Sequence, residues 1–339
     1  MQINNYYAYA HKLQEFREAV GCASSVLILT HDYPDPDSLA CACGISELIA
    51  FWGVKSSVIS FGGFVGRAEN RAMIRFLNIR MIPFVLTEIT EFDRIILVDC
   101  YPGKGNVSLP PEVAVHAVID HHPNVPPPDA PFFHDIRKEY GAASTIVTSY
   151  LLEAGCPINP KLATALFYGI KADTGDMRRE ASAKDIECYK RMFDIMDYRL
   201  LSEIENPDRE VEFFRMLHKA TGETFCYGNV GYAHLGVVTT PDYISEMADF
   251  LHSLEKIEWM ICTGIFKNRI LFSIRSKNSS AGIMAERLAK AFGGSGGGHL
   301  RAAAGQLPIE TDTNICLEKL ELSIREIFNI KNEQKESLL

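Results

Sequence analysis

Residues 25–39 read SVLILTHDYPDPDSL, and this stretch decides how the first half of the chain folds. The apolar run at its start predicts a buried strand, and the polar residues and two prolines after it predict a stiff turn. The turn carries one imidazole and three carboxylates: His31, Asp32, Asp35 and Asp37. In an extended segment Asp35 and Asp37 point the same way, and two like charges side by side require a positive partner such as a pair of metal ions. The alternative is an acidic surface turn.

Outward from this stretch, strand-like and helix-like segments alternate up to residue 170. The alternation predicts an α/β fold with a doubly wound parallel sheet, in which ligands bind at the carboxyl ends of the strands. Three expected strands end in acidic or imidazole residues: 25–29 before His31, 94–98 before Asp99, and 113–119 before Asp120, His121 and His122. We therefore expect these side chains to meet at one edge of the sheet.

Beyond this region the sequence predicts a linker and a second domain. Residues 198–219 are charged and helix-permissive, and they predict a helical linker after a first domain of residues 1–197. Residues 220–332 predict a smaller α/β domain, followed by a polar tail over 333–339. We expect a substrate cleft between the two domains.

Composition restricts the classes of function. The 339 residues carry a formal net charge of −9, which disfavours long nucleic acid as a partner, because affinity for a phosphate backbone needs clustered Lys and Arg. The apolar runs are too short to span a bilayer, and the start of the chain lacks the pattern of a signal peptide. Nine cysteines without a repeated spacing indicate reduced thiols. We expect a cytoplasmic protein with no membrane partner.

The acidic and imidazole residues near the expected strand and helix ends form one candidate metal-binding set. Its members are His31, Asp35, Asp37, Asp99, His121 and Asp173. Oxygen and imidazole donors without thiolate suit manganese or magnesium. A carboxylate that bridges two ions ~3.5–4 Å apart is a recurring design for phosphoryl hydrolysis, and Asp99 is placed to be that bridge. Taken singly, each residue could instead be a satisfied core histidine or a solvated carboxylate.

Several motifs resemble the DHH phosphoesterase superfamily. They are HDYPDPDSLA (31–40), ILVD (96–99), DHH (120–122), GAAST (141–145) and ADTG (172–175). In the second half, FSIRS (272–276) and GGSGGGHLRAAAG (293–305) resemble the DHH-associated C-terminal domain. The resemblance covers nearly the whole chain. Two departures are the extra residues 293–295 before the glycine motif, and Asp176-Met177, where relatives often have a neutral residue and an aromatic.

The resemblance implies a site with two divalent ions. Mn²⁺ is the expected metal, and Mg²⁺ or Co²⁺ are the alternatives. One ion would be bound by His31 and Asp35, the other by Asp37, His121 and Asp173, with Asp99 bridging. The other expected catalytic residues are His122, facing the scissile phosphate, and Asp120, orienting the neighbouring imidazoles. The implied reaction is attack on phosphorus by a water that the two metals activate.

The glycine run predicts a phosphate-binding element, because glycines let backbone N–H groups approach an anion closely. Arg275 and His299 would add charge-assisted hydrogen bonds. The expected substrate-binding residues are Arg275, Ser276, Gly296, Gly297, Gly298 and His299. A flexible glycine linker is the alternative.

Among members of this superfamily, the chain is most similar to short, soluble enzymes of the nano-RNase/pAp-phosphatase type. The resemblance implies a manganese-dependent phosphodiesterase that releases nucleoside monophosphates from oligonucleotides of two to five nucleotides, with pAp 3′-phosphatase as a further activity. The alternatives are a soluble phosphodiesterase for cyclic dinucleotides or linear pApA, and a nucleotide-binding sensor without catalysis. Candidate base-stacking aromatics are Phe64, Tyr101, Phe132, Phe133 and Tyr140. A homodimer is compatible with the apolar helix faces expected in the second domain.

Overall fold

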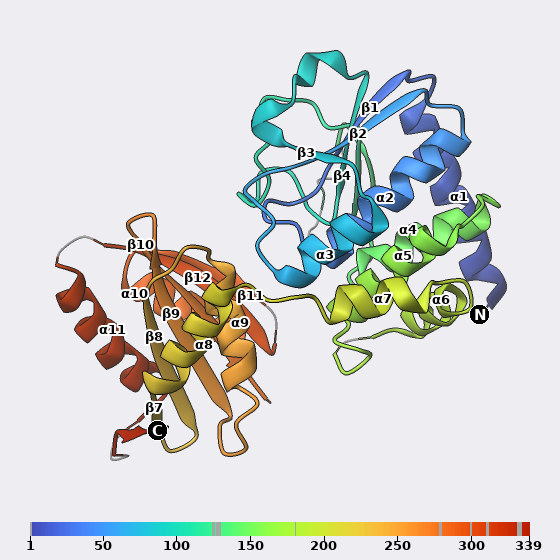
Figure 1. Cartoon of the computed structure of the whole chain (residues 1–339). Helices are drawn as coiled ribbons and strands as arrows, with labels where there is room; N and C mark the ends of the chain where they lie inside the picture. Colours follow the sequence, from blue (N-terminus) through green and yellow to red (C-terminus); the bar gives the residue numbers. More distant parts are fainter. Residues whose placement is uncertain are drawn as a thin grey trace. The chain divides into compact units, whose positions relative to one another are not determined.

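The chain folds into two compact units, residues 1–207 and 208–339. The computed structural model describes residues 2–339 apart from 124, 125, 127–129, 180, 278, 279, 299, 310, 311 and 331–333, with side chains from residue 11 onward. Figure 1 shows the helices and strands of each unit.

The first unit is built on a six-stranded sheet of order β3-β2-β1-β4-β5-β6, in which every neighbouring pair is parallel. Its strands are β1 (Ser25–Leu29), β2 (Ser56–Phe61), β3 (Met81–Pro83), β4 (Arg94–Val98), β5 (Ala117–Asp120) and β6 (Phe133–Ile136). The predicted parallel α/β sheet is confirmed. Its strand order reverses between β1 and β4, which is the position where such sheets bind ligands.

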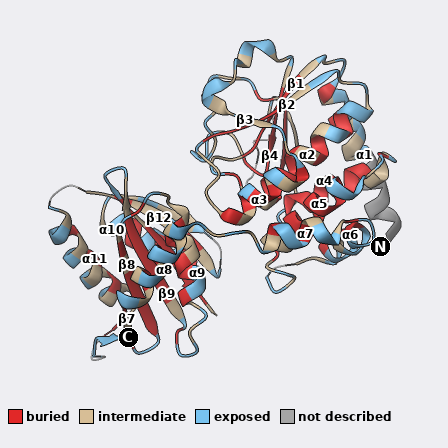
Figure 2. Cartoon of the chain, viewed as in Figure 1, coloured by how far each residue is buried: buried red, intermediate tan, exposed pale blue. Residues whose placement is uncertain are grey.

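The helices of this unit form one core with the sheet. They are α1 (Gln2–Val20), α2 (Pro36–Phe51), α3 (Ala68–Leu77), α4 (Ala143–Glu153), α5 (Pro160–Asp173), α6 (Ala183–Phe193) and α7 (Tyr198–Glu205). Helices α1, α2 and α4 contact the strands, and the other four contact helices. Ile28 and Ile96 point into this helical core. Figure 2 shows much of the central strands and of helices α2, α4 and α5 as buried.

The other face is covered by two 3₁₀ turns, η1 (Phe84–Leu86) and η2 (Ile89–Glu91), and by the segment 100–116. Leu29 and Leu97 point into this second core, because successive strand residues alternate between the two faces. Segment 100–116 reads CYPGKGNVSLPPEVAVH, and its prolines and glycines prevent a helix from forming there.

The second unit contains a seven-stranded mixed sheet of order β11-β12-β10-β9-β8-β7-β13. Its strands are β7 (Thr224–Tyr227), β8 (Val230–Val237), β9 (Trp259–Phe266), β10 (Arg269–Ser276), β11 (Ser295–Gly298), β12 (Ala302–Pro308) and β13 (Glu336–Ser337). The helices are α8 (Val211–Gly222), α9 (Asp242–Leu251), α10 (Ala281–Ala291) and α11 (Thr313–Ile327). One core joins the sheet to α10 and α11, and another joins it to α8 and α9. The predicted second α/β domain is confirmed.

The structure divides the predicted linker, residues 198–219, between the two units. Helix α7 packs against α3 and α5, whereas α8 packs against α9 and β8. The division falls at Pro207, whose ring prevents a single helix from continuing through this point. No helix among the described residues is long and apolar enough to cross a membrane.

Candidate functional site

The carboxyl ends of three neighbouring strands form the candidate site of the first unit. Leu29 pairs with Leu97 and Val98 pairs with Ile119, so the residues that follow β1, β4 and β5 lie side by side. Three sets of candidate metal ligands, each with its ligand atoms within 4.8 Å of one another, gather there. The sets are His31–Asp35–Asp99, Asp37–His121–Asp173 and Asp99–His121–His122.

The first set is arranged around the imidazole of His31. Its Nδ1 lies 2.8 Å from the carbonyl oxygen of Asp32, and because a carbonyl only accepts, Nδ1 carries the proton. The other nitrogen, Nε2, lies 3.5 Å from Asp35 Oδ1 and 3.6 Å from Asp99 Oδ2. The set therefore directs one imidazole nitrogen and two carboxylates toward a common point.

The second set contains His121, Asp37 and Asp173. His121 Nδ1 lies 3.1 Å from the carbonyl oxygen of Tyr140, which leaves Nε2 toward the carboxylates, 3.1 Å from Asp173 Oδ2 and 4.0 Å from Asp37 Oδ2. Asp173 is the last residue of α5, where the helix dipole disfavours a negative charge. A neighbouring positive charge offsets that cost.

Asp35 and Asp37 belong to different sets, which corrects the expectation that an extended segment places them side by side. Helix α2 begins at Pro36, with Asp35 as its N-cap and Asp37 in its first turn. Proline is favoured at the first helical position, and the Asp35 side chain accepts a hydrogen bond from the Ser38 N–H. The helix start therefore separates the two carboxylates.

Asp37 is buried and held by the start of another helix. Its two carboxylate oxygens accept hydrogen bonds from the backbone N–H groups of Ala143 (2.7 Å) and Ser144 (2.8 Å) at the N-terminus of α4. These residues belong to the GAAST stretch, whose role the sequence alone did not disclose. The contact fixes the direction of the carboxylate toward His121.

Asp99 lies between the two sets. Its Oδ1 is 3.5 Å from His121 Nε2, and its backbone adopts a left-handed conformation with φ 56°, which is strained for a residue with a side chain. Asp99 Oδ1 and His121 Nε2 are both buried and make no well-aligned hydrogen bond within the described part of the chain, although His121 Nε2 lies 3.1 Å from Asp173 Oδ2. Leaving a buried polar atom unpaired costs about 1–3 kcal/mol, so these atoms fit a bound cation.

The pKa shifts at the site indicate that several carboxylates lie close together with too little positive charge beside them. Burial and the neighbouring charges of Asp37 and Asp35 raise the pKa of Asp99 well above its usual value. Burial and Asp173 raise the pKa of Asp37 to about 6. Burial lowers the pKa values of both imidazoles, but the nearby carboxylates of Asp35 and Asp173 outweigh it and raise the pKa of His31 to about 9 and that of His121 to about 10. A metal ion would supply the charge that these protons supply.

Asp120 and His122 form a third feature beside Asp99. Asp120 is fully buried, and its Oδ1 accepts hydrogen bonds from the backbone N–H groups of His121 and His122 and from His122 Nδ1 at 2.9 Å. The His122 side chain is 36% exposed, so solvent reaches it. Asp120 thus fixes the tautomer and direction of a partly exposed imidazole at the rim of the site.

The structure also identifies supporting residues that the sequence reasoning missed. Asp185 of α6 is fully buried and accepts hydrogen bonds from the Gly141 N–H, the Thr145 hydroxyl and the Ser182 backbone and hydroxyl. Gly141 and Thr145 flank the two residues that hold Asp37. The S-x-x-D spacing of Ser182 and Asp185 is the capping-box signal that could have identified this carboxylate.

The predicted substrate-binding residues lie in the second unit. The Arg275 guanidinium is paired with Asp249, with Nε 2.5 Å from Oδ1 and Nη2 3.3 Å from Oδ2, and it donates to the Ser273 hydroxyl. This pairing ties β10 to α9. Ser276 is buried at the end of β10. His299 lies outside the described residues.

The glycines of the predicted phosphate cradle form an edge strand, β11, which pairs with β12. A Cβ on Gly296 would lie 2.9 Å from the Ala285 carbonyl oxygen, and a Cβ on Gly298 would lie 2.5 Å from the Ala303 Cα. Of the three glycines in β11, Gly297 alone faces open space. Two of the three glycines are therefore required by packing, independently of any ligand.

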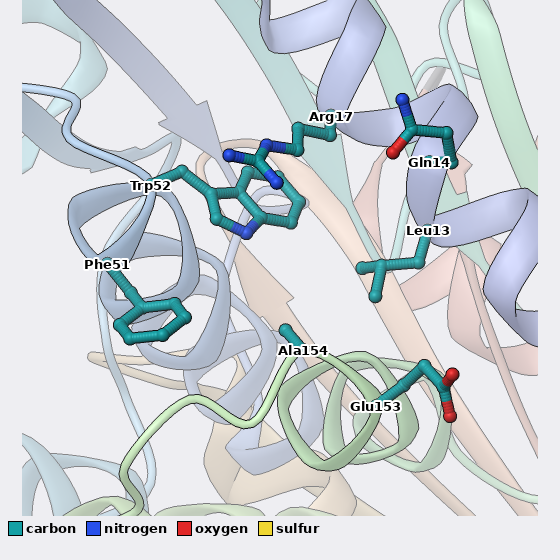
Figure 3. A pocket seen from close by; sticks show the side chains of 7 residues that line it. All are labelled: Leu13, Gln14, Arg17, Phe51, Trp52, Glu153 and Ala154. Atoms are coloured by element: carbon teal, nitrogen blue, oxygen red, sulfur yellow. The ribbon is translucent and has the colours of Figure 1, made fainter.

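A pocket elsewhere in the first unit is shown in Figure 3. It has a volume of about 350 Å³ and is lined by Arg17, Phe51, Trp52 and neighbours from α1, α2 and α4. Phe51 and Glu153 are the last residues of α2 and α4, whereas Asp37 lies at the start of α2 and the N–H groups that hold it lie at the start of α4. The pocket is thus separate from the candidate site.

Comparison with known families gives two matches. Residues 25–170 match the DHH family, N-terminal domain, and residues 228–326 match the DHHA1 domain. The first range contains five of the six candidate metal ligands, and Asp173 lies just beyond it.

Two relatives illustrate the range of similar sequences. An uncharacterized protein of Methanocaldococcus jannaschii is 35% identical over 321 residues, which cover 91% of this chain and 65% of that protein. A probable manganese-dependent inorganic pyrophosphatase of Bacillus cereus is 24% identical over 68% of this chain and 76% of its own length. The chain thus spans less than two thirds of the length of the Methanocaldococcus relative.

Solved structures share the fold. An exopolyphosphatase-related protein from Bacteroides fragilis superposes with a TM-score of 0.77 at 14% identity, covering 95% of this chain and 98% of that one. RecJ from Thermus thermophilus in complex with Mn²⁺ superposes with a TM-score of 0.53 at 13% identity, covering 96% of this chain and 55% of that one. At these identities the likeness concerns the fold alone.

Proposed function

Because this chain belongs to the DHH phosphoesterase superfamily and carries a C-terminal DHHA1 domain, we propose that it is a manganese-dependent phosphodiesterase. Its proposed substrates are oligonucleotides of two to five nucleotides, which it hydrolyses to nucleoside monophosphates, and pAp is a further substrate. The observation that supports the proposal is the pair of buried atoms without a well-aligned hydrogen bond, Asp99 Oδ1 and His121 Nε2, between two sets of candidate ligands.

The proposed metal ligands follow the two sets of side chains. His31 and Asp35 would hold one divalent ion, Asp37, His121 and Asp173 the other, and Asp99 would contact both. When bound, the two cations offset the negative charge that develops on a phosphoryl group and make water more acidic. The donor atoms are oxygens and imidazole nitrogens, which suits manganese, with Mg²⁺ and Co²⁺ as alternatives.

His122 is the proposed proton donor to the leaving oxygen. Its Nδ1 lies 2.9 Å from Asp120 Oδ1, so Nε2 is the nitrogen that would transfer a proton to the leaving oxygen. Its partial exposure supports contact with substrate, whereas the other two imidazoles are directed into the ligand sets.

The choice of substrate rests on the acidic charge of the chain and its similarity to other DHH proteins. A net charge of −9 disfavours long polymers, and a short substrate needs only local cations. A phosphodiesterase for cyclic dinucleotides or pApA is the second candidate. The relatives named as inorganic pyrophosphatases make pyrophosphate a necessary comparison.

Product analysis with Mn²⁺ tests the proposal, offering a dinucleotide, pAp, a cyclic dinucleotide, pyrophosphate and a long RNA side by side. We expect the dinucleotide and pAp to be preferred, and Asp99→Asn to lower turnover about a thousandfold, since it removes several kcal/mol of transition-state stabilisation. Asp194→Asn, an exposed change on the end of α6, is the matched control. Undiminished turnover by Asp99→Asn would contradict the proposal. Preference for the cyclic compound would favour the second candidate, and nucleotide binding without product would indicate a sensor.

A further inference from the structure

An exposed aromatic ring stands at the rim of the candidate metal site. Tyr33 lies between His31 and Asp35 in the chain, is 47% exposed and has a left-handed backbone with φ 59°. This conformation costs a residue with a side chain about 1–2 kcal/mol, which burial of half of the ring roughly offsets. The other half of the ring stays exposed and can contact a ligand.

The segment after β2 is shaped to receive the ring. The Tyr33 N–H donates to the Gly62 carbonyl oxygen at 3.0 Å, and a Cβ on Gly63 would lie 2.7 Å from Tyr33 Cε1. The ring of Phe64 meets that of Tyr33 edge-to-face, with centroids 5.2 Å apart and an interplanar angle of 90°. Gly63 thus permits the close approach, and Phe64 fixes the orientation of the Tyr33 ring.

The loop that carries Tyr33 is anchored on both sides. The Asp32 carboxylate accepts hydrogen bonds from the Ser108 N–H and hydroxyl, both at 2.9 Å. The buried Asn70 side chain donates to the Pro34 carbonyl oxygen at 3.0 Å. A ring held in this way loses little conformational entropy when a ligand binds, which favours affinity.

We propose that Tyr33, braced by Phe64, stacks against a nucleobase of the substrate, and so selects nucleoside-containing phosphates over inorganic ones. The inference rests on the proposed function, because the proposed function places the substrate phosphate at the metal ligands His31 and Asp35. Each of these residues is two positions from Tyr33, a separation of at most about 7 Å along the chain. Every base presents a π-face, so this contact is tolerant of base identity.

The contact with the base can be separated from the contact with the phosphate by competitive inhibition. We would measure the inhibition of dinucleotide hydrolysis by AMP and by inorganic phosphate, with Mn²⁺ present. Tyr33→Leu should raise the inhibition constant of AMP roughly five- to hundredfold, the loss that one base stack produces, and leave that of phosphate unchanged. Tyr33→Phe should restore AMP affinity. Phe51→Leu removes a ring of similar exposure, 50%, at the far end of α2 and is the matched control.

An unchanged inhibition constant for AMP in Tyr33→Leu would overturn the inference. An equal rise in the inhibition constant of phosphate would also overturn it, because it would indicate that the loop between His31 and Asp35 is distorted.

A second measurement keeps the inference separate from the proposed function. In Tyr33→Trp, AMP should quench the added fluorescence while ribose 5-phosphate should not, whether or not the protein hydrolyses dinucleotides. If the wild-type protein fails to hydrolyse dinucleotides while AMP still quenches the fluorescence of Tyr33→Trp, the proposed function is refuted and the stacking inference stands.

Discussion

Asp99 shows how single residues of this site combine several physical costs. It is buried, adopts a left-handed backbone and leaves one carboxylate oxygen unpartnered within the described part of the chain. Its neighbours His31 and His121 have raised pKa values because carboxylates surround them. Protons and metal ions therefore compete for the same positions.

This competition predicts how stability depends on pH. The folded pKa values of His31 (about 9) and His121 (about 10) exceed the ordinary 6.5, so the folded metal-free protein holds protons that the unfolded chain releases. The stabilisation is fully present below pH 6.5 and is lost as pH rises through 9 and 10. We expect the free energy of unfolding of chelator-treated protein to fall across this range.

Urea unfolding at a series of pH values measures this dependence. Saturating Mn²⁺ should remove the decline, because metal ligands must be deprotonated to bind. His31→Gln should reduce the slope for metal-free protein, while His218→Gln, on the exposed face of α8, should leave it unchanged. A slope that is identical in His31→Gln and the wild type would contradict the assignment.

At the scale of elements, helix starts position the ligands. The beginning of α2 separates Asp35 from Asp37, and the beginning of α4 holds Asp37 through the N–H groups of Ala143 and Ser144. Helix N-termini stabilise carboxylates because their N–H groups are unpaired and their dipole is positive there. Asp185 of α6 in turn holds both sides of the α4 start.

Asp185→Asn is therefore expected to weaken metal binding without touching a metal ligand. Loss of the charged acceptor loosens the Gly141 and Thr145 contacts, so Asp37 is held less firmly. We expect Mn²⁺ affinity to fall about 10–100-fold, as for other residues that orient metal ligands. Calorimetric titration with Mn²⁺ measures the change, and Asp194→Asn on the same helix is the control. Wild-type affinity in a folded Asp185→Asn protein would refute this role.

Over the whole molecule, all seven residues of the three ligand sets lie in the first unit, and the predicted phosphate-binding residues lie in the second. Each unit has its own sheet and its own core clusters. The chain carries two tryptophans, Trp52 in the first unit and Trp259 in the second. Fluorescence can thus follow each unit separately.

Manganese should stabilise the first unit selectively. At a hundredfold excess over the dissociation constant, binding adds about 2.7 kcal/mol, which raises the melting temperature of a unit of this size by roughly 5–10 °C. In Trp259→Phe the remaining Trp52 reports on the first unit, and we expect this rise in melting temperature. In Trp52→Phe the remaining Trp259 reports on the second unit, and we expect little change in melting temperature. Equal shifts from both reporters would show that ion binding involves the second unit as well.

The sequence by itself determined the parallel sheet and the set of residues at its strand ends. Apolar runs followed directly by Asp and His suffice for that inference, because the carboxyl ends of parallel strands meet at one edge. Asp99 and His121 could be selected as candidates for this reason, and Asp173 through its motif. These are local patterns whose consequence follows from a general rule of topology.

Only the tertiary structure decided which atoms face one another. The separation of Asp35 from Asp37 depends on where α2 begins, and the hydrogen bonds of Asp37 come from residues more than 100 positions away. The pairing of Arg275 with Asp249 and the contact of Tyr33 with Gly63 likewise join separate elements. Such contacts depend on packing across the fold, which no local sequence pattern encodes.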